Sequence, residues 1–232
     1  TNGQVSGRRN MVINGAMNVA QRSASVTGIG ASAGYFTLDR WNINTGDSAG
    51  RLTMAQTADG PVGFANCLKL DCTTADTSIA AGENMILQQK FEGQDVQQLK
   101  KGTSDAEKIT VSFYAKQNEE RDIVLALYDS ESDRYIGKVV TIGTDWTRHT
   151  VTFDGDTTGA ITDDNASRFE LWWWLHSGTT FTSSALTTTW AASTSGSNLA
   201  AGTESFFAST NNTFFLTGVQ MEVGSVATNF EH

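Results

Sequence analysis

Proline, cysteine and histidine are scarce in this sequence, and each shortage narrows what the chain can be. One Pro stands against 22 Gly, so Gly, Asn and Asp must make the turns, as in proteins built from many short strands. The two cysteines, Cys67 and Cys72, would face opposite sides of one predicted strand, and we interpret them as small buried hydrophobes. With only three His, among them the terminal His232, the chain lacks the material for a Cys/His zinc site.

Positive charge and long apolar runs are also in short supply. The formal net charge of -9 argues against nucleic acid or an anionic membrane surface as a partner, because phosphate binding needs clustered Lys and Arg. No apolar run approaches the roughly 18 residues of a membrane span, and no secretory signal opens the chain. Because the sequence begins with Thr1, we expect a processed or excised piece of a longer protein.

The sequence does contain a series of segments in which apolar and polar residues alternate. Four consecutive segments, "ITVSFYAK", "DIVLALYD", "RYIGKVVTI" and "WTRHTVTF", alternate with a period of two and predict a meander of antiparallel strands. We predict further strands in "YFTLDRWNINT", "RLTMAQT" and "FANCLKLDCT", a final strand in the closing "TFFLTGVQMEVGSVATNFEH", and one helical turn in "QDVQQLKKGTSDAEK". The expected organisation is an N-terminal arm and entry strand over residues 1–34, then one all-β domain over 35–232.

The segment "RFELWWWLHSG" carries three consecutive tryptophans, which lie on both faces of any strand. Alternation places Phe169, Leu171, Trp173 and Leu175 in the core of the sheet, and Glu170, Trp172, Trp174 and His176 on the opposite face. Trp172 and Trp174 therefore need another partner, which is a second layer, a neighbouring subunit or a ligand. The long connection that follows, from Ser177 to Asn212, is typical of a functional segment or of one packed by its own aromatics.

Several stretches resemble phage tail-fibre and virion structural proteins common in marine bacteriophages. The stretches are "NMVINGAMNVAQRSASVTG", "QQKFEGQDVQQLKKGTSDAEKITVSFYAK" and, above all, the closing "GVQMEVGSVATNFE". The middle strands are similar to the jelly-roll sandwiches of carbohydrate-binding modules. The resemblance implies an antiparallel β-sandwich of jelly-roll type, a homotrimer, and a place in or near host attachment.

The candidate binding residues are aromatic side chains on the non-core faces of predicted strands. Trp172, Trp174, Tyr114 and Tyr128 would form a platform for glycan rings, or else a subunit interface or second hydrophobic layer. His176, Arg148 and Glu170 would supply polar contacts in the glycan case, and would otherwise be ordinary surface groups.

Metal binding and catalysis are both disfavoured by the sequence. Asp154, Asp156 and Thr158 are spaced as in a calcium loop, but Asn165 replaces the bidentate Glu and no helices flank the loop, so an acidic hairpin is the better interpretation. Carboxylate pairs that glycoside hydrolysis would require, such as Asp129 with Glu131, lie in charged turns where solvated carboxylates are expected. We expect no cofactor and no enzymatic activity.

The resemblance thus implies a virion appendage, a tail fibre or similar protein, on the surface of a phage particle. It would attach to host surface glycans without catalysis and contact other virion proteins through its N-terminal arm. The alternatives are a purely structural or decorating trimer subunit that binds no sugar, and a fragment of a depolymerase.

Overall fold

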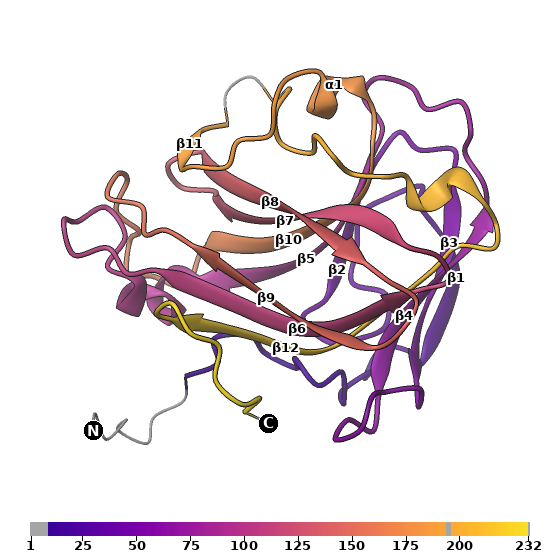
Figure 1. Cartoon of the computed structure of the whole chain (residues 1–232), viewed down its shortest axis with the longest axis horizontal. Coiled ribbons are helices and arrows are strands. Elements are labelled where there is room, and N and C mark those ends of the chain that lie inside the picture. Colours follow the sequence, from indigo (N-terminus) through magenta and orange to yellow (C-terminus); the bar gives the residue numbers. More distant parts are fainter. Residues whose placement is uncertain (1–8, 194–195, 232) are drawn as a thin grey trace.

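Two antiparallel sheets packed face to face form the computed structural model, which describes residues 9–193 and 196–231 (Figure 1). The first sheet contains, in spatial order, β1 (Ser25–Ile29), β3 (Arg51–Thr57), β4 (Cys67–Thr74), β12 (Thr213–Val223), β6 (Ile109–Gln117) and β9 (Thr147–Phe153). The second contains β11 (Ala191–Ala192), β8 (Arg134–Ile142), β7 (Arg121–Asp129), β10 (Ser167–Ser177), β5 (Asn84–Glu92) and β2 (Asn42–Gly46). The predicted all-β antiparallel sandwich is confirmed.

The chain crosses repeatedly from one sheet to the other, which is the connectivity of a jelly roll. β3 and β4 are neighbours in the first sheet and β7 and β8 in the second, whereas β4 to β5, β5 to β6 and β6 to β7 are crossings. The predicted four-strand meander is therefore wrong, because β9 pairs with β6 and not with β8. Alternation of apolar and polar residues shows which side chains of a strand face the core. It does not show which strands are paired, because the pattern is the same when the next strand lies in the same sheet and when it lies in the opposite sheet.

The remaining predicted elements are confirmed with one exception. β3, β4 and β12 form where expected, and the predicted helical turn consists of two short 3-10 helices, η1 (Gly93–Asp95) and η2 (Gln97–Leu99). The strand predicted in "YFTLDRWNINT" is shorter than expected, since β2 begins only at Asn42. Before it, the neighbours Thr37 and Leu38 are both fully buried and Arg40 has a φ of 72°, so this part does not alternate as a strand does.

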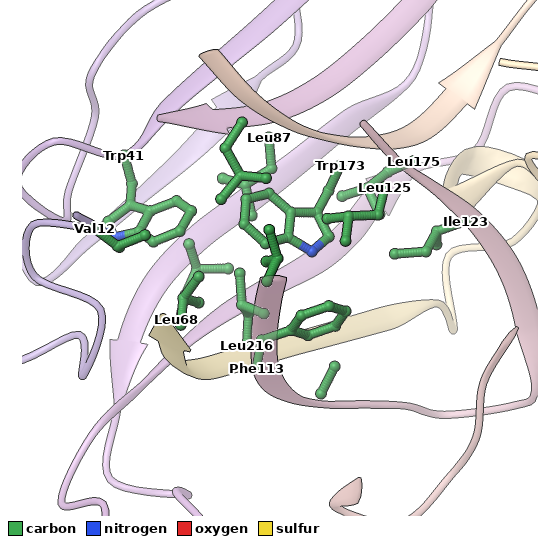
Figure 2. Close-up of a cluster of buried hydrophobic side chains, with 14 of the residues drawn as sticks. Val12, Trp41, Leu68, Leu87, Phe113, Ile123, Leu125, Trp173, Leu175 and Leu216 are labelled. Carbon is green, nitrogen blue, oxygen red and sulfur yellow. The ribbon is translucent and has the colours of Figure 1, made fainter. Parts of the chain in front are cut away.

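One hydrophobic core fills the space between the sheets (Figure 2). Trp41, which precedes β2, and Trp173 of β10 lie side by side with ring centroids 5.5 Å apart, and the Phe113 ring meets Trp173 edge-on at 5.8 Å. Cys67 and Cys72 are buried and free, as predicted.

Residues 9–34, the described part of the predicted arm, pack on the sandwich. Met11 and Val12 are buried, and the backbone of Met11 donates to Met221 O at 3.0 Å. The turn at Asn14 has a φ of 58°, and Val219 N donates to Gly15 O at 3.0 Å. Residues 1–8 lie outside the described part of the chain, and contact with other virion proteins stays a prediction.

Helical structure is sparse: besides η1 and η2 there are α1 (Thr179–Thr182) and η3 (Phe206–Ala208) in the described ranges. None of the helices formed by these residues has the length and apolar character needed to cross a membrane.

Candidate functional site

The tryptophan strand β10 faces two different hydrophobic clusters, as its alternation predicts. Phe169, Leu171 and Trp173 belong to the core between the sheets. Trp172 and Trp174 belong to a second cluster on the outer face of the second sheet. Of the three partners expected for this face, the structure provides a second layer within the same chain.

The second layer comes from the long connection between β10 and β12, which we call the covering segment (residues 178–193 and 196–212). In Figure 1 this orange segment, with β11 and α1, lies over the second sheet. The Tyr135 hydroxyl donates to Leu199 O, and Ala200 N donates to Phe181 O at 2.9 Å. The resulting outer cluster consists of Ile86, Val124, Ala126, Tyr135, Trp172, Trp174, Leu199 and Ala200, with Tyr128, Phe181 and Leu186 packed against it.

The covering segment leaves a shallow pocket of about 230 Å³ over the edge of the outer cluster, towards β2. Its apolar lining comes from β5, β10 and the covering segment, and its polar rim comes from β2 and the start of β5. The apolar residues are Ile86, Trp172, Trp174, Phe181 and Leu199, and the rim residues are Asn44, Thr45, Gly46 and Asn84. An apolar aromatic floor with a few polar groups on its rim is the usual composition of a small-ligand site.

Both indoles of the pocket are held in place by close neighbours. The Tyr128 ring packs on Trp172 with centroids 4.5 Å apart, and Trp172 Nε1 donates to Glu170 Oε2 at 2.7 Å. Trp174 contacts Phe181 of α1 at 5.2 Å. Burial, followed by the hydrogen bond to Asp133, raises the pKa of Tyr128 to about 12, so its hydroxyl remains protonated at neutral pH. The two indoles of the floor are therefore packed against fixed neighbours, and neither indole carries a charge.

A larger hollow, of about 450 Å³, lies between the N-terminal segment and the C-terminal end of the described chain. Its lining contains several Asn side chains but a single aromatic ring, that of Phe230. It therefore offers less apolar ring surface than the tryptophan pocket.

Two predicted site residues, Tyr114 and Arg148, lie far from this pocket in the fold. They are cross-strand neighbours on β6 and β9 of the first sheet. The Tyr114 ring packs against Phe64 at 5.3 Å, and Arg148 Nη2 donates to Ser112 Oγ at 3.1 Å. Alternation assigned these residues correctly to a non-core face, but that face belongs to the other sheet, so the prediction of one shared platform is wrong.

His176 does not share a face with the tryptophans either, because the pairing of β10 with β5 shifts by one residue between Trp174 and His176. A β-bulge of this kind reverses the direction of the side chains that follow it. The imidazole is fully buried and meets the ring of Phe207 edge-on at 5.2 Å. It cannot supply a polar contact to a ligand in the pocket.

The surroundings of His176 contain two acidic residues that the sequence did not indicate. His176 Nε2 lies 3.2 Å from Glu83 Oε2, and Asp76 lies beside both. Burial lowers the pKa of His176 more than the two carboxylates raise it. Burial alone would raise the pKa of Asp76, but its hydrogen bonds, first that with the Glu83 side chain and then those from Ala49 N and Ser78 N, hold that pKa below its usual value.

Ser205, His176 and Glu83 are linked as in a nucleophilic triad, since His176 Nδ1 lies 2.8 Å from Ser205 Oγ. However, Ser205 Oγ also accepts from Phe207 N and so caps η3, and the imidazole has no exposed surface. Two Gly-x-Ser-x-Gly strings, around Ser32 and Ser48, likewise lack the strand-turn-helix setting of a nucleophile elbow. We assign none of these serines a catalytic role.

The two carboxylates of the calcium candidate form ion pairs with basic side chains. Asp154 pairs with Lys108 at 2.5 Å, while Asp156 accepts from Arg134 Nε at 2.6 Å and lies 3.1 Å from Lys101 Nζ. Thr158 donates its backbone N–H to Asp156 Oδ1 at 3.1 Å. These carboxylates already have cationic partners.

The expectation of a solvated carboxylate at position 129 is wrong, because Asp129 shares Lys101 with Asp156 in a buried ion network. Asp129 is fully buried, and its Oδ2 lies 2.5 Å from Lys101 Nζ. Its partner in the proposed catalytic pair, Glu131, instead accepts from the hydroxyl and the backbone N–H of Thr162. The pair therefore has the contacts of a structural ion network.

Comparisons with known proteins identify similar solved structures only. No protein-family model and no curated protein matches the chain. A CBM4 structure is 14% identical, with 91% of this chain and 99% of that chain covered and a TM-score of 0.47. A family 11 carbohydrate-binding module from Clostridium thermocellum, in complex with a mixed-linked tetrasaccharide, is 9% identical, with coverages of 82% and 92% and a TM-score of 0.43.

A third similar structure is the enzymatically active domain of tailspike protein 4 from bacteriophage CBA120. It is 12% identical, with a TM-score of 0.41, and the match covers 92% of this chain but 21% of that chain. At these identities and scores the three matches leave the ligand and the partners of this chain unassigned.

Proposed function

We propose that this chain binds a glycan without catalysis, at the pocket floored by Trp172 and Trp174. The observation that carries the proposal is the combination of two indoles with a polar rim in one hollow of the second sheet. Aromatic rings pack against the apolar faces of sugars, and the side-chain amides of Asn44 and Asn84 can both donate to and accept from sugar hydroxyls.

The size and exposure of the pocket limit what it can hold. Its volume of about 230 Å³ is below the roughly 300–1,000 Å³ of sites for drug-sized ligands. Trp172 and Trp174 are only 8% and 2% exposed, so each offers a ligand only a small part of its ring. We infer a ligand of one or two sugar rings, such as the end of a chain, bound with modest affinity.

The biological setting that we propose rests on the resemblance of the sequence to phage tail-fibre and virion structural proteins. In this setting the chain is a homotrimeric appendage on the surface of a phage particle and attaches to host surface glycans. Its N-terminal residues contact other virion proteins. The tryptophans give no support for a trimer, because the covering segment of the same chain supplies the partner that a neighbouring subunit would have supplied. The resemblance alone supports that part of the proposal.

The burial of the two tryptophans also favours a second candidate function, that of a structural virion subunit that binds no sugar. Trp172 and Trp174 are almost entirely covered within a single chain, as expected for side chains whose role is to hold a second layer on the sheet. The two candidates differ in one measurable property, which is glycan affinity.

A glycan array followed by calorimetry with the best ligand tests the proposal. We expect the double variant Asn44→Ala/Asn84→Ala to bind roughly tenfold or more weakly, because each lost hydrogen bond contributes about 0.5–1.5 kcal/mol. The matched control Asn211→Ala removes an exposed amide before β12, outside the pocket, and should bind as the wild type does. If the wild type binds no glycan, or the control loses as much affinity as the double variant, the pocket is not a glycan site.

A further inference from the structure

Three potential metal ligands from distant parts of the sequence converge at one end of the second sheet. Asp76 follows β4, Glu83 precedes β5, and His176 lies near the end of β10. Their side chains are all more than nine-tenths buried, and one ligand atom from each lies within 4.8 Å of the other two. The contact between His176 Nε2 and Glu83 Oε2 is 3.2 Å.

This group contains two buried acids, and the basic side chain that faces them in the described chain is His176 itself. Among the described residues, no Lys or Arg forms an ion pair with Asp76 or Glu83. The buried carboxylates Asp129 and Asp156, in contrast, share Lys101. Burying neighbouring carboxylates without a cation is strongly unfavourable, so the site requires either bound protons or a bound cation.

The orientation of the ligand atoms suits a cation. In the tautomer in which Nδ1–H donates to Ser205 Oγ at 2.8 Å, the lone pair of His176 Nε2 faces Glu83 Oε2 and can bind an ion between them, whereas in the other tautomer Nε2–H donates to Glu83 Oε2. Histidines that bind metals are commonly fixed in this way, through a hydrogen bond from the other ring nitrogen. Backbone N–H groups of Ala49 and Ser78 similarly fix the carboxylate of Asp76.

We propose that Asp76, Glu83 and His176 bind one divalent transition-metal ion of the Zn²⁺ type. Ligands about 2.0–2.1 Å from a tetrahedral ion lie roughly 3.3–3.4 Å apart, close to the 3.2 Å between Nε2 and Oε2. An imidazole in the ligand set favours Zn²⁺ and its neighbours over Ca²⁺ or Mg²⁺, which prefer oxygen ligands alone. Water or a backbone carbonyl completes the coordination.

The ion would have a structural role. It would link β10 with the loop between β4 and β5 and, through Ser205, with the covering segment. Backbone hydrogen bonds already join these parts, since Gly178 N donates to Glu83 O at 2.8 Å and Asp76 N donates to Phe207 O at 2.8 Å. Metal binding is therefore expected to stabilise the folded chain, whether or not a glycan binds.

The test uses tag-free protein, stripped with EDTA and then freed of chelator, because a polyhistidine tag would itself bind Zn²⁺. Calorimetry with ZnCl₂ should give one ion per chain, and the melting temperature should rise with Zn²⁺ but not with CaCl₂. Co²⁺ in place of Zn²⁺ adds a spectroscopic readout of the coordination. A wild-type protein that shows no saturable Zn²⁺ binding and no rise in melting temperature overturns the proposal, and this result does not depend on any variant.

Variants locate the ion. Glu83→Gln and His176→Gln should each weaken Zn²⁺ binding by more than the roughly 10–100-fold that loss of an outer-shell partner causes. The matched controls are His149→Gln, which removes a histidine of β9, and Asp154→Asn, which removes an exposed carboxylate. Both controls should keep wild-type affinity. Should Glu83→Gln, folded by circular dichroism, bind Zn²⁺ as tightly as the wild type, the ion is held elsewhere and the assignment is wrong.

Discussion

Replacing Trp174 with alanine tests whether the outer cluster is a true second core of the single chain. Trp174 is 2% exposed and contacts Phe181 at 5.2 Å and Trp172 at 5.9 Å. Truncating a buried tryptophan to alanine typically costs about 3–5 kcal/mol, because the transfer free energy is lost and a cavity remains. We expect Trp174→Ala to lower the free energy of unfolding by about this amount.

The measurement is urea unfolding followed by far-UV circular dichroism, at two widely different protein concentrations. Because the atoms around Trp174 belong to its own chain, the loss should be independent of concentration. The control Trp146→Ala removes a half-buried indole that packs on Phe215, and we expect a smaller loss of about 1–2 kcal/mol. A Trp174→Ala protein of unchanged stability would refute the second core, and a loss that shrinks on dilution, as a subunit contact dissociates, would place Trp174 in an interface instead.

Two further predictions concern the buried ion network. Lys101→Met should lower the free energy of unfolding by about 3–5 kcal/mol, because it leaves Asp129 buried without its cation, whereas Lys100→Met on the surface should change it little. The urea unfolding midpoints of Lys101→Met and Lys100→Met test this prediction. Equal shifts of the two midpoints would contradict it. Burial alone would raise the pKa of Asp156, but hydrogen bonds from Arg134 and Lys101 hold that pKa below its usual value. This stabilisation is therefore present above the unfolded pKa of about 3.9 and is lost as the pH falls through the folded pKa. Urea midpoints that stay constant between about pH 5 and pH 3 would show that Asp156 contributes none.

Local alternation was sufficient to predict the fold class and the two faces of β10. Trp173 faces the main core and Trp172 and Trp174 face away from it, because side-chain direction depends on position along a single strand. The long connection after Ser177 was also expected to be packed by its own aromatics or functional, and Phe181 packs on Trp174. Neither conclusion requires knowledge of which strands are neighbours.

Strand partners, and any site that depends on them, could not be predicted in this way. Tyr114 and Tyr128 both alternate outward, yet they lie on different sheets because the chain crosses the core between β6 and β7. His176 was misplaced by a bulge that leaves no mark in the residue pattern. The scarcity of histidine argued against a Cys/His zinc site only, and gave no information on a single His that meets two distant carboxylates.

The covering segment explains why the pocket and the three-ligand cluster occur together. Phe181 and Leu199 form one wall of the pocket, while Ser205 of the same segment contacts His176. On the opposite side, Asn84 of the rim directly follows Glu83 of the cluster. An ion that fixes Glu83 and His176 would therefore also fix the rim and one wall, and a preorganised pocket loses less conformational entropy when a ligand binds. For this reason metal binding is best measured by the stability of the chain, and glycan binding by glycan affinity. A change in glycan affinity alone does not distinguish the loss of a contact with the sugar from a less ordered covering segment.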